Sequence, residues 1–82
     1  MNDAHEQMSQ KFARGSRVRV SATGGWKQSF CGAVRADPES TVTLKGAAFI
    51  HWVEFDEPQE CVDGSDQYIT AQILGCYLEA AS

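Results

Sequence analysis

With 82 residues, the chain is long enough for one domain and too short for two. Its hydrophobic content of 43% excludes a disordered chain, and its net charge of −4 argues against nucleic acid as the main partner, because phosphate binding needs clustered Lys and Arg. No apolar run approaches the roughly 18 residues that a membrane helix requires, so we expect no membrane partner.

Three cysteines, Cys31, Cys61 and Cys76, are widely spaced and form no C-x-x-C pair. Their odd number fits a disulfide framework poorly, and their spacing is not that of a zinc site. We therefore expect reduced thiols, a cytoplasmic protein, and no metal or other cofactor. The polar N-terminus has no apolar core of the length that a signal peptide needs, which agrees with this location. Of the three thiols, Cys61 is expected to be the exposed one.

The start of the chain is predicted to be a polar N-terminal arm, flexible or briefly helical, over residues 1–11. Asp3 and Glu6 have the spacing of a helix-capping pair, but a helix this short is marginal unless it docks. The remaining residues, 12–82, are assigned to one folded domain. Deletion of residues 1–10 is therefore expected to leave the fold intact.

Alternation of apolar and polar residues predicts a series of short strands. In residues 17–21, Val18 and Val20 point to one side and the polar residues to the other. Residues 49–55 form the strongest pattern and are largely apolar on both faces, which predicts a central strand covered on both sides. Further strands are expected over residues 30–36, 41–44, 67–70 and 76–79.

Glycine and proline residues mark the connections between these strands. Residues 37–40 are typical of a type I turn, residues 46–48 are expected to end a strand, and residues 56–66 should form an acidic loop. Residues 71–74 are predicted to make one helical turn before the last strand. Gly32 within a strand indicates a bulge or tight bend. This pattern predicts an all-β barrel of about five strands.

Three segments carry a resemblance to known families: residues 14–20 (RGSRVRV), the Gly-x-Val strand at residues 32–34, and residues 53–56 (VEFD). Together they resemble small SH3-like barrel proteins, among them the photosystem I subunit IV family, the variable chain of ferredoxin–thioredoxin reductase and some nitrogen-fixation accessory proteins. Residues 52–59 are also similar to small uncharacterised bacterial proteins. The resemblance implies an SH3-like barrel with a docking or assembly role and no catalytic residues of its own.

A second resemblance is to the type II dihydrofolate reductases, which are SH3-like tetramers with a central pore. Residues 15–19 and Trp26 match that family's motifs in order, but its pore lysine is missing, because Val20 and Ser21 occupy the corresponding places. The candidate pore residues are Ser65, Gln67, Tyr68 and Ile69. Their aromatic and aliphatic members are exchanged relative to the family, which in a strand changes the side chain that faces the pore.

Aromatic side chains are the best binding candidates, because they anchor interfaces and line peptide grooves. These candidates are Trp26, Trp52, Tyr68 and Tyr77. Trp26 lies in a glycine-rich loop and is expected to be the most exposed, so Trp26→Ala should be tolerated where Phe55→Ala unfolds the protein. His51, between Phe49 and Val53, is expected to be a buried, hydrogen-bonded histidine and not a catalytic base.

The acidic residues near the end of the chain could only bind a metal ion in an irregular site, because their spacing is not that of an EF-hand. They are Asp56, Glu57, Glu60, Asp63 and Asp66. A solvated loop is preferred, and the alternative is a dipolar domain that docks its acidic loop to a basic patch. Because no residue set requires catalysis, we expect a non-catalytic module that binds a protein partner or itself as a homo-oligomer. The alternative function is a small-molecule-binding, reductase-like oligomer with a pore at its subunit interfaces.

Overall fold

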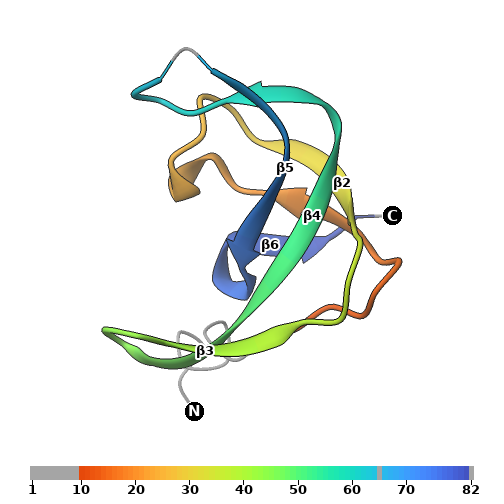
Figure 1. The fold of residues 1–82 in the computed structure, drawn as a ribbon, viewed down its shortest axis with the longest axis vertical. Coiled ribbons are helices and arrows are strands. Elements are labelled where there is room, and N and C mark those ends of the chain that lie inside the picture. Colours follow the sequence, from red (N-terminus) through yellow and green to blue (C-terminus); the bar gives the residue numbers. More distant parts are fainter. Residues whose placement is uncertain (1–9, 65, 82) are drawn as a thin grey trace.

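The computed structural model of the protein describes residues 10–64 and 66–81 (Figure 1). Its elements, in chain order, are β1 (Arg17–Val20), η1 (Ala22–Gly24), β2 (Phe30–Val34), β3 (Glu39–Thr43), β4 (Gly46–Glu60), β5 (Gln67–Leu74), η2 (Gly75–Tyr77) and β6 (Leu78–Ala80), where η denotes a short 3₁₀ turn. The described residues contain no α-helix, so the all-β prediction is confirmed. Most of the predicted N-terminal arm lies outside the described residues.

All the strands belong to one antiparallel sheet that curls into a half-barrel (Figure 1). The strand order is β3-β4-β2-β1-β6, and β5 pairs with β4 off this path. The β4 strand has 15 residues and pairs with three others, so it is shared between two hairpins. The β6 strand closes back on β1, where Ala80 lies opposite Val18.

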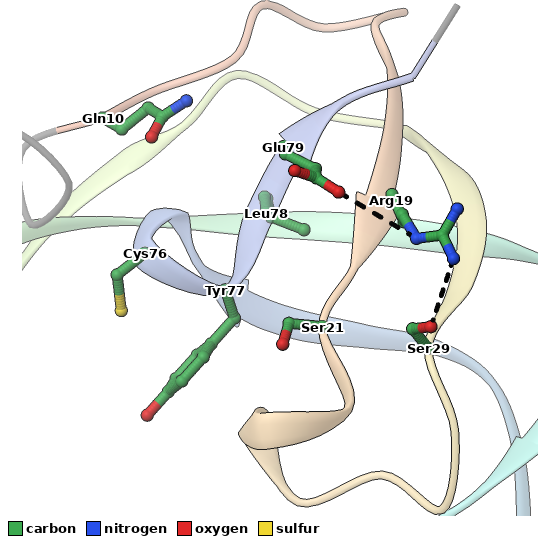
Figure 2. Close-up of a pocket in the computed structure, with 8 residues that line it drawn as sticks. All are labelled: Gln10, Arg19, Ser21, Ser29, Cys76, Tyr77, Leu78 and Glu79. Atoms are coloured by element: carbon green, nitrogen blue, oxygen red, sulfur yellow. Dashed lines mark hydrogen bonds and ion pairs between the residues drawn. The ribbon is translucent and has the colours of Figure 1, made fainter.

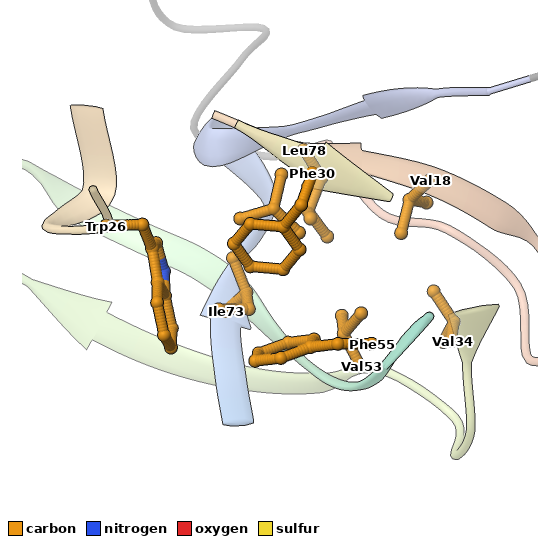
Figure 3. Packing of buried hydrophobic residues seen from close by; sticks show 9 residues of the cluster. Val18, Trp26, Phe30, Val34, Val53, Phe55, Ile73 and Leu78 are labelled. Carbon is orange, nitrogen blue, oxygen red and sulfur yellow. The ribbon is translucent and has the colours of Figure 1, made fainter. Parts of the chain in front are cut away.

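The core fills the inner face of the curled sheet (Figure 3). The alternation predicted for β1 is confirmed, because Val18 and Val20 are fully buried while Arg17 and Arg19 are exposed. The buried cluster consists of Val18, Val20, Trp26, Phe30, Val34, Val53, Phe55, Ile73 and Leu78. Its aromatic members pack edge to face, with ring centroids 4.5–5.3 Å apart, an arrangement that adds to the stabilisation from buried area.

The extent of β4 differs from the sequence prediction at both ends. Residues 46–48 were expected to end a strand, yet β4 starts there, because a two-residue turn at Leu44 and Lys45 folds the chain back with Gly46 at a φ of 120°. Residues 56–66 were expected to be a loop, but β4 continues to Glu60. Its pairing with β5 is interrupted by a bulge between Glu54 and Gln59 and resumes at Gln59. The loop is therefore confined to the residues after Glu60.

Two further predictions for this region are wrong. Residues 71–74 are not a helical turn but the end of β5, where Ile73 is buried opposite His51; the helical turn follows as η2. The central strand is also not covered on both faces. His51 and Val53 are completely buried, whereas Trp52 on the opposite face is 43% exposed.

Two glycines allow close approaches between segments that are distant in sequence. A Cβ atom on Gly32 would collide with the backbone carbonyl of Glu54, so this glycine serves close packing between β2 and β4. A Cβ atom on Gly75 would collide in the same way with the carbonyl oxygen of Gln10. The first described residues therefore lie directly against η2.

Candidate functional site

Three depressions adjoin one another where η2 leads from β5 to β6, and Tyr77 lines all three. One is polar, has a volume of about 370 Å³ and lies over the outer side of β1 and β6 (Figure 2). The other two are mainly apolar, with volumes of about 320 and 330 Å³, and share Leu74 and Tyr77. The two apolar depressions thus adjoin each other at Leu74 and Tyr77, and together they are treated as one groove.

We call this feature the η2 groove. It is lined chiefly by Gly24, Trp26, Ile50, Leu74 and Tyr77, and at its far end by Leu44 from the β3–β4 turn. Its lining includes Leu74 of β5 and Ile50 of β4, which lie opposite each other in the sheet. Within residues 10–64 and 66–81, β5 has a strand partner only on its β4 side. The groove therefore brings apolar side chains together at the end of β5, a strand with one open edge.

The position of Tyr77 is fixed by η2 and by the β1–η1 connection. Its carbonyl oxygen accepts a hydrogen bond from the backbone N–H of Ser21 at 2.8 Å. Its ring lies over Gly24, where a Cβ atom would come within 3.3 Å of the ring carbon Cγ. Figure 2 shows the side chain pointing away from Ser21 and from the Arg19–Glu79 pair. Tyr77 is thus held from its backbone side while its ring lines the groove.

The predicted binding aromatics gather around β5, but Trp26 does not have the expected exposure. Trp26 is only 7% exposed, because its segment folds back to form a bridge with Cys61 and its ring packs against Phe30 and Phe55. Tyr68 lies edge-on to Trp26, with ring centroids 6.0 Å apart. Trp52 lies opposite Gln72, a residue that lines the groove, so Trp52 flanks it.

Sequence reasoning missed the two leucines of the groove, Leu44 and Leu74. Leu74 lay in the segment that was expected to be helical. Leu44 could have been found from the sequence, because it is a large apolar residue just before Lys45 and Gly46, in a turn where polar residues are usual. In the structure its side chain is completely exposed.

The polar depression is organised by Arg19. Its guanidinium Nε lies 3.9 Å from a carboxylate oxygen of Glu79, and its Nη2 donates to the hydroxyl of Ser29 at 3.4 Å (Figure 2). These groups are all exposed, and both contacts are long, so each contributes little to stability. The depression is therefore a solvated surface beside the η2 groove.

The acidic residues at the end of β4 meet basic partners within the same chain. Arg17 makes two contacts with the Asp56 carboxylate, at 2.8 and 2.5 Å, and this hydrogen bonding lowers the pKa of Asp56. Lys27 donates to Glu60 at 2.5 Å and lowers the pKa of Glu60, with a further contribution from Gln67. Among the described residues, no three His, Cys, Asp or Glu side chains gather as a metal site would require.

His51 is buried and hydrogen-bonded, as the sequence predicted. It is 0% exposed, its Nε2 accepts the backbone N–H of Phe12 at 2.9 Å, and its Nδ1 lies 3.3 Å from the carbonyl oxygen of Ile73. Burial lowers the pKa of His51, an effect that the hydrogen bond with Ile73 partly opposes. Burial of the ring therefore favours its neutral form over its charged form.

The three cysteines are free thiols, and all are half-buried, so exposure does not set Cys61 apart. Of the candidate pore residues, Ser65 lies outside the described residues. The other three, Gln67, Tyr68 and Ile69, are exposed at the start of β5. In the part of the chain that the structure describes, no helix has the length and apolar character needed to cross a membrane.

Comparison of the chain with protein-family models, with curated proteins and with solved structures gives no match.

Proposed function

We propose that this protein is an SH3-like barrel that acts as a non-catalytic protein-interaction module, and that its η2 groove binds an extended apolar segment of a partner protein. The observation that carries the proposal is the pair of adjoining apolar depressions at the end of β5, a strand with one open edge. They share Leu74 and Tyr77 and are completed by Trp26 in one and Leu44 in the other. The curled sheet, with a 3₁₀ turn immediately before the last strand, supports the barrel assignment.

The shape of the groove favours a peptide over a compact small molecule. Each apolar depression lies at the lower end of the volume range of small-molecule sites, roughly 300–1,000 Å³. Because the two depressions adjoin at Leu74 and Tyr77, neighbouring side chains of one extended peptide could occupy them in turn. Extended peptides are recognised in this way, with backbone groups at a strand edge and side chains in neighbouring hollows.

A peptide library displayed on phage, selected against the full-length protein, would test the proposal. Selected peptides should be apolar and extended, and Leu44→Asp should weaken their binding by about tenfold or more, since a charge would be buried in the contact. Leu44 is fully exposed, so this variant should fold normally. Val62→Asp is the matched control, because Val62 is 61% exposed and lies outside the groove.

The location of binding can be checked independently by NMR chemical-shift mapping with the tightest selected peptide. The largest shifts should fall on Tyr77, Leu74 and Gln72. Shifts that cluster elsewhere, or peptides that bind the Leu44→Asp variant as well as the wild type, would overturn the proposal.

The second candidate function is the reductase-like oligomer. It is favoured by one observation: Tyr68 and Ile69 are 42% and 49% exposed next to the exposed Gln67, as residues lining a pore between subunits would be. We expect no turnover of dihydrofolate with a reduced nicotinamide cofactor, because the pore lysine is missing and the order of Tyr68 and Ile69 is exchanged. Measurable turnover that Gln67→Ala abolishes would reverse the ranking of the two functions.

A further inference from the structure

We propose that β3 pairs edge to edge with β3 of a second copy of this chain, in antiparallel orientation and centred on Val42. This interface uses the open edge of β3 and adjoins the far end of the η2 groove at Leu44, and it goes beyond the proposed function.

The first observation is that β3 is an open edge whose charged residues, Glu39 and Lys45, stand at its two ends and leave its centre unprotected. Within residues 10–64 and 66–81, β3 pairs only with β4, so its other side has no strand partner. Natural sheets protect such edges with charged side chains, proline or bulges. The sequence Ser-Thr-Val-Thr-Leu over residues 40–44 has none of these protections, and its pairing with β4 is regular. An edge of this kind readily accepts another strand.

The second observation is the exposure of apolar side chains on this hairpin. Val42 is 83% exposed, and its cross-strand neighbour Ala47 is exposed as well. In a pairing centred on Val42, the two valines of the two copies lie directly opposite each other. Cross-strand pairs of β-branched residues are among those that stabilise sheets.

The third observation is that the charges at the two ends of β3 are self-complementary. Glu39 begins the strand and Lys45 lies just after its end. An antiparallel pairing centred on Val42 sets Glu39 of each copy opposite Lys45 of the other, and Thr41 opposite Thr43. The two-fold symmetry creates the ion pair twice, at the two ends of the interface. Because the charges of β3 complement each other, the strand expected to pair with this edge is β3 of a second copy. The same charges favour the antiparallel orientation.

The experiment is sedimentation equilibrium on the full-length protein over a range of concentrations. The wild type should show a concentration-dependent dimer. Val42→Lys should weaken dimerisation by at least about tenfold, because it sets like charges opposite each other at the centre of the pairing. The control is Val62→Lys, which adds the same charge at another exposed valine and should leave the dimer unchanged.

A charge-reversal cycle tests the orientation. Glu39→Lys and Lys45→Glu should each weaken the dimer, because each brings like charges together twice, and the double variant should restore it. Circular dichroism of each variant checks that the fold is retained. A wild type that is monomeric at all concentrations, or a dimer that Val42→Lys leaves intact, would overturn the inference, and a failure of the double variant to recover would overturn the antiparallel pairing. The effect of Leu44→Asp on peptide binding is measured in the Val42→Lys variant, which should be monomeric. Peptide binding and dimerisation are then tested apart, so either proposal can fail without the other.

Discussion

The backbone N–H of Phe12 donates a hydrogen bond to Nε2 of His51, 39 positions later in the chain, at 2.9 Å. Since Nε2 accepts, Nδ1 must carry the proton of the neutral ring, and it points to the carbonyl oxygen of Ile73. The rings of Phe12 and His51 also pack edge to face, with centroids 5.7 Å apart. One buried imidazole thus connects the start of the described chain to β4 and β5.

This arrangement predicts that the protein loses stability as the pH falls below the ordinary pKa of histidine. Because burial lowers the pKa of folded His51, the unfolded chain takes up a proton first, at about pH 6.5, and the folded state only at lower pH. The free energy of unfolding should therefore be fully retained above about pH 6.5 and decline below it, by at most ~1.4 kcal/mol per pH unit, until the pH reaches the folded pKa. Urea unfolding at several pH values measures this slope.

The control is His51→Gln, which cannot titrate in this range. The variant should be less stable at neutral pH and should show a flatter dependence between about pH 5 and about pH 7. Equal slopes in the two proteins would show that His51 is not the titrating group.

Trp26→Ala should be strongly destabilising, contrary to what its glycine-rich loop indicated. Its ring packs against Phe30 and Phe55 and is 7% exposed, so truncation should cost ~3–5 kcal/mol, comparable to Phe55→Ala. Trp52→Ala removes the same side chain from a site that is 43% exposed and should cost about 1 kcal/mol. Chemical denaturation of the three variants gives the comparison, and equal losses for the two tryptophans would contradict it.

Gly32→Ala should destabilise the protein by ~1–3 kcal/mol, because the added methyl group would meet the Glu54 carbonyl and the Val53 side chain and push β2 away from β4. Gly64→Ala is the matched control, since a Cβ atom there would meet nothing within 4 Å. Its effect should stay within about 0.5 kcal/mol. Thermal melts of both variants would show whether the close approach is real; a neutral Gly32→Ala would argue against it.

The Arg17–Asp56 pair should make the protein sensitive to acid. Hydrogen bonding lowers the pKa of Asp56 in the folded state, so its contribution is present above the unfolded value of about 3.9 and is lost as the pH falls through the folded pKa. Asp56→Asn should flatten the acid side of the stability curve, and added salt should reduce the difference because the pair is exposed. Asp63→Asn is the control; an unchanged acid slope in Asp56→Asn would refute the assignment.

Local patterns predicted the parts of this fold that depend on neighbouring residues. The alternation around Val18 and the burial of His51 both follow from which face of a strand a side chain occupies. The burial of Trp26 was not predictable in this way, because it depends on a bridge to Cys61, which is 35 positions away. The length of β4 was missed for a similar reason. Acidic residues occur both in loops and on the outer face of a strand, so only the pairing with β5 shows that these residues continue β4.

The same limit applies to the candidate site. Tyr77 was chosen because aromatic residues anchor interfaces, and it does line the groove. Leu74 was missed because its place in the groove depends on β5 extending as far as residue 74. Leu44 was missed because the β3–β4 hairpin that presents it was assigned to the wrong residues.

The sharing of β4 between two hairpins has a consequence for the order of assembly. The β3–β4 and β4–β5 pairings join segments that are close in sequence, so closing them costs little chain entropy. The pairing of β6 with β1 joins Ala80 to Val18 across almost the whole described chain and comes at the largest entropic cost. We therefore expect β4 to be structured in the folding transition state and β6 to dock last. In native-state hydrogen exchange, the amides of β6 should then open well before those at the centre of β4.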